Sequence, residues 1–288
     1  MSTLHLKPWQ KDHSGVTTSG YVDGEDRRIG IRIYSPHDDI DDPNTPKILE
    51  LNGIIVDQGS MRTPARAAAA LGYTAITLDY SNLNTLTPVE HNAQDGLDVL
   101  DAVGADEYRL LGHSMGGAVA THVAAMTPHT ITNLDLVAPG GLTDATVGLN
   151  LLAVARAFQF ETIDELMSGA RDPFLAATIA LGSLLNCHRR PSAVIAEANQ
   201  LLHETAYPQL LQVRRERPDT VVTLAHGSHD KLVPRKPLLS SIRQHEADEG
   251  ISLIDVDIPY RGTHSAINYQ AALMQRILLE SSGITPVE

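Results

Sequence analysis

The sequence has a single cysteine, few basic residues relative to its acidic ones, and no long apolar run. Cys187 has no second cysteine to pair with, which excludes an internal disulfide and favours a reducing compartment. The formal net charge of −13 argues against a nucleic-acid or anionic-membrane partner, because both need a basic face. The longest apolar stretch, Phe174 to Leu185, is too short to span a bilayer and is interrupted by polar and small residues.

Other familiar signals are also missing. Met1 to Asp12 is polar and lacks the apolar core of a signal peptide, and we find no internal repeat or low-complexity tract. The 288 residues are 42% hydrophobic and 20% charged, close to an ordinary globular protein. We therefore expect a cytoplasmic protein built from one large α/β domain or two small ones.

Strand and helix patterns alternate along most of the chain. The expected strands are 21–24, 28–34, 48–51, 74–78, 108–111, 134–138, 220–225 and 251–258, and the expected helices are 60–71, 88–103, 115–126, 236–246 and 265–280. This alternation predicts a mostly parallel, doubly wound sheet with helices on both faces. Such sheets bind ligands at the carboxyl ends of their strands.

The alternation stops between residues 142 and 218, where only helical patterns occur. We expect residues 1–141 and 219–288 to form the α/β core and residues 142–218 to form an inserted helical cap. This block contains more apolar residues than a helical hairpin needs, Phe158 and Phe174 among them. They are candidates for lining an apolar substrate pocket, and the alternative is that they only pack against one another.

The segment Gly112-His113-Ser114-Met115-Gly116 matches Gly-x-Ser-x-Gly, between an apolar run and a run of small residues. A sharp strand-to-helix turn with small flanking residues exposes a serine hydroxyl as a nucleophile. The alternative is a chance match, which the flanking apolar strand and small-residue helix make less frequent. We therefore predict that Ser114 is a nucleophile.

A serine nucleophile needs a histidine base and an acid that orients it. Asp230 follows the β-branched run 220–225, so it is placed at the end of a strand, on the same sheet edge as Ser114. Asp255 and Asp257 are rivals but alternate within a strand, and Asp144 is a weaker rival from an earlier loop. The alternative for Asp230 is a turn-capping residue.

His264 follows the last strand and is the candidate base among 13 histidines. His113 adjoins the nucleophile, but its side chain should leave the elbow in the wrong direction for a base. A metal site formed by His226, His229 and Asp230 is disfavoured, because the spacing is loose and no second ligand cluster supports it. We expect no metal and no cofactor.

Two backbone N–H groups should stabilise the oxyanion of an acyl-transfer intermediate. Met115, directly after the nucleophile, supplies one. The loop after strand 48–51 supplies the other, from Ile54 or alternatively from Gly53. Asn52, Gly53 and His113 are further candidates for lining the substrate pocket.

The elbow, the Asp230 loop, His264 and the inserted helical block together resemble the α/β-hydrolase superfamily, from about residue 21 to residue 280. The resemblance implies an eight-stranded, mostly parallel sheet beneath a helical cap. It implies Ser114 as nucleophile, His264 as base and then acid, and Asp230 as the orienting carboxylate. Many members carry His-Gly at the end of the third strand, where this chain has Asn52-Gly53.

The predicted function is hydrolysis of a small-to-medium apolar carboxylic ester through an acyl-enzyme on Ser114. One alternative is a carbon–carbon bond hydrolase or a cofactor-free haloperoxidase-like enzyme with the same three residues. Another is a non-catalytic ligand receptor, which is disfavoured because all three positions are filled. Epoxide and haloalkane hydrolases need an aspartate where this chain has Ser114.

Overall fold

The computed structural model describes residues 2–12, 15–25, 27–40, 42, 44–53, 61–79, 89–143, 205–264, 266–268 and 270–284. The strands are β1 (Thr3–Leu6), β2 (Gln10–Asp12), β3 (Gly15–Asp23), β4 (Arg28–Ser35), β5 (Lys47–Leu51), β6 (Thr74–Asp79), β7 (Glu107–His113), β8 (Thr130–Val137), β9 (Val221–Gly227) and β10 (Val256–Tyr260). The helices are α1 (Arg62–Ala70), α2 (Val89–Val103), α3 (Met115–Met126), α7 (Tyr207–Glu216), α8 (Arg235–Glu249), the short 3₁₀ helix η2 (Ala266–Asn268) and α9 (Ala271–Glu280).

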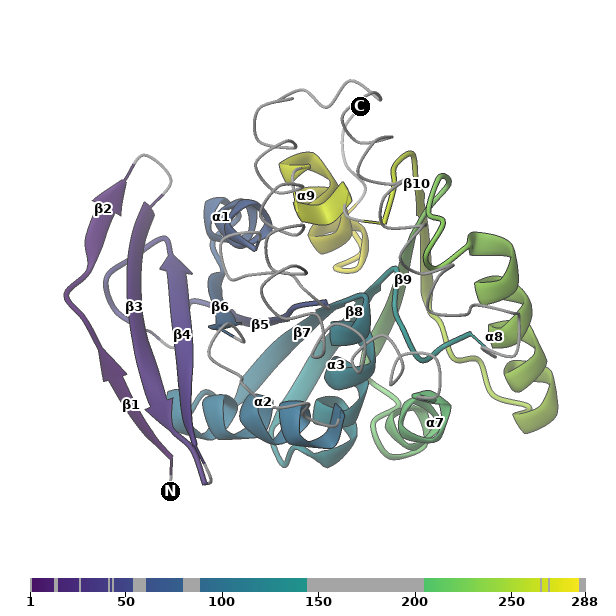
Figure 1. The fold of residues 1–288 in the computed structure, drawn as a ribbon, viewed down its shortest axis with the longest axis horizontal. Coiled ribbons are helices and arrows are strands. Elements are labelled where there is room, and N and C mark those ends of the chain that lie inside the picture. The colour runs from purple at the N-terminus through teal and green to yellow at the C-terminus, as the bar shows by residue number, and fades with distance from the viewer. Residues whose placement is uncertain are drawn as a thin grey trace, which may run out of the picture.

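The strands form one twisted sheet in the order β1-β3-β4-β6-β5-β7-β8-β9-β10, with β2 added beside β3 (Figure 1). From β6 to β10 all neighbouring strands are parallel, whereas β1 to β4 join the sheet in antiparallel pairs. The parallel strands β7, β8, β9 and β10 therefore end at one edge of the sheet, which is where their following loops meet.

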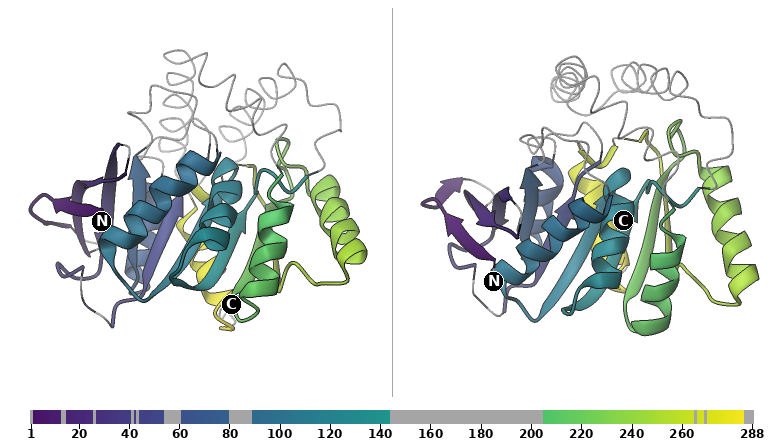
Figure 2. Two further views of the ribbon diagram at one scale, coloured as in Figure 1. Left: turned by 90° about the horizontal axis from the view of Figure 1, so that it is seen from below. Right: turned by 60° about the horizontal axis from the view of Figure 1, so that its bottom comes forward.

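Helices cover both faces of the sheet, as the alternation of patterns predicts. One apolar core lies beneath α1 and α9, and a second lies against α2, α3, α7 and α8. Figure 2 shows α2, α3 and α7 in front of the sheet with α9 behind it. The α/β fold class predicted from the sequence is thus confirmed.

The sheet has ten strands in the described part of the chain, whereas eight are expected from the resemblance. β1 and β2 are the strands that the patterns miss. Both are short, and β1 alternates between exposed and half-buried residues at the edge of the sheet. The hydrogen bonds to β3 determine these two strands more than their own residues do. Their sequences therefore show little of the apolar alternation that predicts a strand.

Several boundaries differ from the prediction: β3 begins at Gly15 rather than residue 21, and β8 begins at Thr130 rather than residue 134. β10 begins at Val256 rather than residue 251, and Asp255 accepts a hydrogen bond from the N–H of Val222 through its side chain (2.8 Å). The last helix is divided into η2 and α9, and Gln270 before α9 has a non-helical backbone (φ −106°, ψ 87°). None of the described helices is long and apolar enough to cross a membrane.

The described chain stops at residue 143 and resumes at residue 205. Hydrogen bonds join the residues just before this gap to those just after it. The N–H of Ala206 donates to the carbonyl of Gly141 (2.8 Å), and the Tyr207 hydroxyl donates to that of Leu142 (2.7 Å). The helix that follows, α7, packs against α3, with Leu210 in the sheet core. The predicted cap range 142–218 therefore includes one helix that packs on the core.

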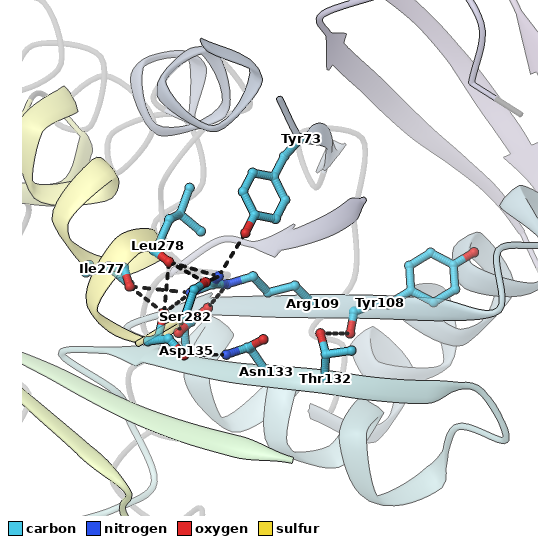
Figure 3. A network of polar contacts seen from close by, with 10 residues as sticks. Tyr73, Tyr108, Arg109, Thr132, Asn133, Asp135, Ile277, Leu278 and Ser282 are labelled. Atoms are coloured by element: carbon cyan, nitrogen blue, oxygen red, sulfur yellow. Dashed lines mark hydrogen bonds and ion pairs between the residues drawn. The ribbon is translucent and has the colours of Figure 1, made fainter. Parts of the chain in front are cut away.

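A buried ion pair joins the sheet to the last helix, on the face of the sheet that α9 covers (Figure 3). Arg109 on β7 donates from Nε and Nη2 to the carboxylate of Asp135 on β8, at 2.5 and 3.1 Å. Its guanidinium also donates to the carbonyls of Ile277 and Leu278 in the last turn of α9 (3.4 and 3.3 Å). The Ile277 carbonyl also accepts from the N–H of Ser281 (3.1 Å), so Arg109 adds a side-chain donor to the end of α9.

Candidate active site

Ser114 lies in a sharp turn between β7 and α3, as the sequence predicts. Its backbone is strained (φ 57°, ψ −126°), a conformation that is rare for a residue with a side chain. Its N–H donates to the Val137 carbonyl on β8 (3.0 Å), and its carbonyl accepts from Gly117 and Gly140 (2.8 and 2.7 Å). These bonds on both sides hold the strained turn in place.

The glycines of the motif are required by close packing. A Cβ on Gly112 would lie 2.3 Å from the Gly116 carbonyl oxygen, and one on Gly116 would lie 2.1 Å from the carbonyl oxygen of Leu51. Strand β7, helix α3 and the end of β5 therefore approach too closely for larger residues. This close packing explains why both flanking positions of the Gly-x-Ser-x-Gly motif are glycine.

Asp230 and His264 form a buried pair in the loops after β9 and β10. His264 Nδ1–H donates to Asp230 Oδ2 (2.9 Å), and the other carboxylate oxygen accepts from the N–H groups of Leu232 and Val233 (2.9 and 2.7 Å). The carboxyl group of Asp230 is thus held by three hydrogen-bond donors. With its proton on Nδ1, the neutral imidazole of His264 carries no proton on Nε2, the nitrogen that would act as the base.

Backbone bonds fasten these two loops to one another. The N–H groups of Ser228 and His229 donate to the carbonyls of Tyr260 and Gly262 (2.9 and 3.0 Å). A Cβ on Gly227 would lie 2.5 Å from the Gly262 carbonyl oxygen, so this crossing also requires a glycine. The loop that carries Asp230 and the loop that carries His264 are therefore positioned as one unit.

His113 connects this unit to the serine turn. It directly precedes Ser114, its Nε2 lies 2.9 Å from the His264 carbonyl oxygen, and the two imidazole rings are 5.0 Å apart. Burial, and secondarily the neighbouring His264, lower the pKa of His113 to about 3. The structure thus brings Ser114, His264 and Asp230 to the same sheet edge, and it buries His113, predicted at the substrate pocket, beneath them.

The rival acids occupy other surroundings. Asp255 is paired with Arg214 at 2.8 and 2.9 Å and precedes β10, at the opposite end of that strand from the His264 loop. Asp257 accepts from His226 Nε2 (2.6 Å), and burial lowers the pKa of His226 despite that carboxylate. Asp144 lies outside the described residues. Among the described residues, no three metal-ligating side chains cluster, His226 and His229 included.

The oxyanion candidates are described in part. Met115 is the first residue of α3, so its N–H belongs to the helix turn that lacks intrahelical acceptors. Gly53 lies against the nucleophile, since a Cβ there would be 3.3 Å from Ser114 Oγ. Asn52 is buried, and its Nδ2 lies 3.5 Å from the Leu78 carbonyl. The predicted residues Ile54, Phe158 and Phe174 lie outside the described part of the chain.

One buried acid near the site is missed by sequence reasoning. Glu50 on β5 is fully buried, and within the described residues neither carboxyl oxygen has a hydrogen-bond partner. Burial raises its pKa well above the ordinary value of 4.5, which makes the neutral acid the stable form. A glutamate inside the apolar run Ile48 to Leu51 is the signal that could have revealed it.

Comparison with known proteins gives both a family and several relatives. A model of the alpha/beta hydrolase family matches residues 58–272. The dihydrolipoyllysine-residue acetyltransferase component of the acetoin cleaving system of Pseudomonas putida is 28% identical over 173 residues, or 57% of this chain and 43% of that protein. The 2-hydroxy-6-oxo-6-phenylhexa-2,4-dienoate hydrolase of Burkholderia cepacia is 36% identical over 80 residues, 25% of this chain and 28% of the relative.

These matches span less than half the length of either curated relative. Among solved structures, the enol-lactonase of Burkholderia xenovorans superposes with a TM-score of 0.67 at 15% identity. That superposition covers 91% of this chain and 99% of the enol-lactonase. At such low identity the likeness concerns the fold alone.

Proposed function

Because this chain belongs to the alpha/beta hydrolase family, we propose that it hydrolyses small-to-medium carboxylic esters through an acyl-enzyme on Ser114. The observation that carries the proposal is the strained Ser114 turn beside the buried Asp230–His264 pair. The enol-lactonase, whose name denotes cleavage of a cyclic ester, has a similar fold. The apolar composition of the segment 144–204, which we propose forms a helical cap, favours an apolar acyl group.

The proposed reaction has two halves. His264 Nε2 takes the proton of the Ser114 hydroxyl as Oγ attacks the ester carbonyl, and Asp230 holds the imidazolium that forms. The N–H of Met115, with a second N–H from the loop at Gly53 or Ile54, stabilises the oxyanion. The alcohol leaves with the proton from His264. Water then loses a proton to His264 and attacks the acyl-enzyme. As the acid leaves, His264 returns that proton to Ser114 Oγ, which restores both residues.

The test is the hydrolysis of a chain-length series of p-nitrophenyl esters by the wild type and by Ser114→Ala. We expect the variant to lose about 10⁴-fold or more in kcat/KM while remaining folded, because it removes the nucleophile. Ser240→Ala, an exposed serine on α8, is the matched control and should keep the wild-type rate. Near-wild-type turnover by a folded Ser114→Ala protein would refute the proposal.

A second candidate is the hydrolysis of a carbon–carbon bond with the same three residues. It is favoured by the 36% identity over 80 residues to 2-hydroxy-6-oxo-6-phenylhexa-2,4-dienoate hydrolase. A panel of diketone substrates beside the ester series separates the two candidates. Turnover of a diketone at a kcat/KM well above that of every ester would favour the second.

A further inference from the structure

His113 is a buried histidine for which the proposed reaction has no chemical use. Its side chain is 1% exposed, and its Nε2 lies 2.9 Å from the carbonyl oxygen of His264. A carbonyl oxygen only accepts hydrogen bonds, so Nε2 must carry the proton in this contact. In the neutral ring Nδ1 is then bare, and it has no hydrogen-bond partner among the described residues.

We propose that His113 is a positioning residue, which holds the main chain of His264 in place by donating its Nε2–H to the His264 carbonyl. This inference rests on the proposed function, since it concerns the base of that reaction. Asp230 holds the His264 ring at Nδ1, and His113 holds the same residue at its backbone. With two anchors, the imidazole is fixed in both orientation and position.

The hydrogen bond from His113 to His264 affects the nucleophile as well as the base, because of where His113 lies in the chain. His113 is the last residue of β7 and is linked to Ser114 by one peptide bond. His113 therefore contacts both sides of the reaction: it is bonded covalently to Ser114 and by a hydrogen bond to His264. This residue thus helps to fix the distance between the nucleophile and the base. Misplacing a reacting group by about 1 Å costs about 10²-fold in rate.

Two other roles for His113 agree less well with its surroundings. A substrate-contacting residue needs access to the pocket, but this side chain is buried and its N–H is aimed at the protein backbone. A second general base needs to exchange protons near neutral pH. The pKa of His113 is lowered to about 3, mainly by burial and also by the nearby His264 ring, whereas the hydrogen bond to the His264 backbone and the charge of Asp230 act in the opposite direction. The ring therefore stays a neutral donor.

The test compares His113→Phe, which keeps a planar ring without an N–H, with His113→Gln, which keeps an N–H donor. We expect His113→Phe to lower kcat for ester hydrolysis about 10- to 100-fold with little change in KM, because the base moves and the pocket does not. His113→Gln should recover most of that loss. His122 is the matched control, since it is also buried and its Nδ1 lies 2.9 Å from a backbone carbonyl, that of Ala118 within α3. His122→Phe should lower thermal stability and leave kcat unchanged.

Wild-type kcat in a folded His113→Phe protein, an equal loss in His113→Gln, or a rise in KM alone would each overturn the inference.

Long-range ¹⁵N NMR of the histidine rings in the wild type keeps the test valid if the variants do not fold. We expect one ring that stays neutral with its proton on Nε2 from pH 5 to 9, and whose signal disappears in His113→Gln if that variant folds. Titration of every histidine ring in this range would contradict the proposal. Absence of wild-type esterase activity would instead refute the proposed function, and the NMR spectrum would still report the His113 bond.

Discussion

Asp230 and Glu50 are both buried carboxyl groups near the same edge of the sheet, but their surroundings differ. Asp230 accepts three hydrogen bonds, two of them from backbone N–H groups and one from His264. Glu50 has none among the described residues, and burial raises its pKa. At the scale of single residues, the fold therefore supplies hydrogen-bond donors to Asp230 and favours the neutral acid at Glu50.

This difference predicts how stability depends on pH. The pKa of Glu50 is raised above 4.5 in the folded state, so between pH 4.5 and that raised value the folded protein holds a proton that the unfolded chain has lost. Glu50 therefore lowers the free energy of unfolding as pH rises through this interval. Glu50→Gln removes the titration, so the variant should gain stability over the wild type as pH rises from 5 to 8. Urea denaturation of both proteins at several pH values measures this difference in the free energy of unfolding.

Glu107→Gln serves as the control for this comparison, because Glu107 is an exposed glutamate on β7. It should leave the pH dependence of the wild type unchanged. If the stability curves of the wild type and Glu50→Gln run parallel from pH 5 to 8, the buried neutral state assigned to Glu50 is wrong.

Residue-level prediction from the sequence is strongest where a strand end determines the position. Ser114, Asp230 and His264 each follow a strand pattern, and the structure brings all three to one sheet edge. The bond from His113 to His264 joins positions 151 residues apart, so no local pattern indicates it. The isolation of Glu50 likewise depends on which side chains surround β5 in three dimensions.

At the scale of elements, the Arg109–Asp135 pair joins β7 and β8 to the end of α9. Both side chains are almost fully buried, and Arg109 also bonds to Tyr73 and Ser282 (Figure 3). The pair therefore links β7, which leads into Ser114, to α9, which follows the His264 loop.

Removing one member of a buried pair leaves a charge without compensation. We expect Arg109→Leu to lower the free energy of unfolding by about 3–5 kcal/mol. The double variant Arg109→Leu/Asp135→Leu should lose less than the sum of the two single variants, because it buries no lone charge. Chemical denaturation of the four proteins measures the coupling between the two residues.

The exposed pair Arg215–Glu249, with contacting atoms 2.6 Å apart, provides the control. Arg215→Leu should cost less than about 1 kcal/mol. Additive losses in the Arg109 and Asp135 variants would show that the two residues act independently, contrary to this account.

Element prediction follows the strength of the local pattern. β5 to β9 and the described helices between them are expected from apolar runs and periodicity, and all are present. β1 and β2 are missed because both are short, and β1 alternates between exposed and half-buried residues. The start of β10 is misplaced because the Asp255 side chain, rather than a continued strand ladder, bonds to the N–H of Val222.

At the scale of the whole molecule, the residues on either side of 144–204 lie together on the alpha/beta hydrolase core. Gly141 and Ala206 are hydrogen-bonded, and α7 packs back onto α3. We therefore propose that the residues between them form a unit inserted above the site, with the core on either side.

The central claim of this account is that Ser114 is an activated nucleophile, and covalent labelling tests it most directly. The intact protein is treated with a fluorophosphonate and its mass is measured, with Ser114→Ala and Ser240→Ala alongside. The account predicts one adduct on the wild type and on Ser240→Ala, and none on Ser114→Ala. A folded wild-type protein that takes up no label, or an adduct that persists in Ser114→Ala, would contradict it.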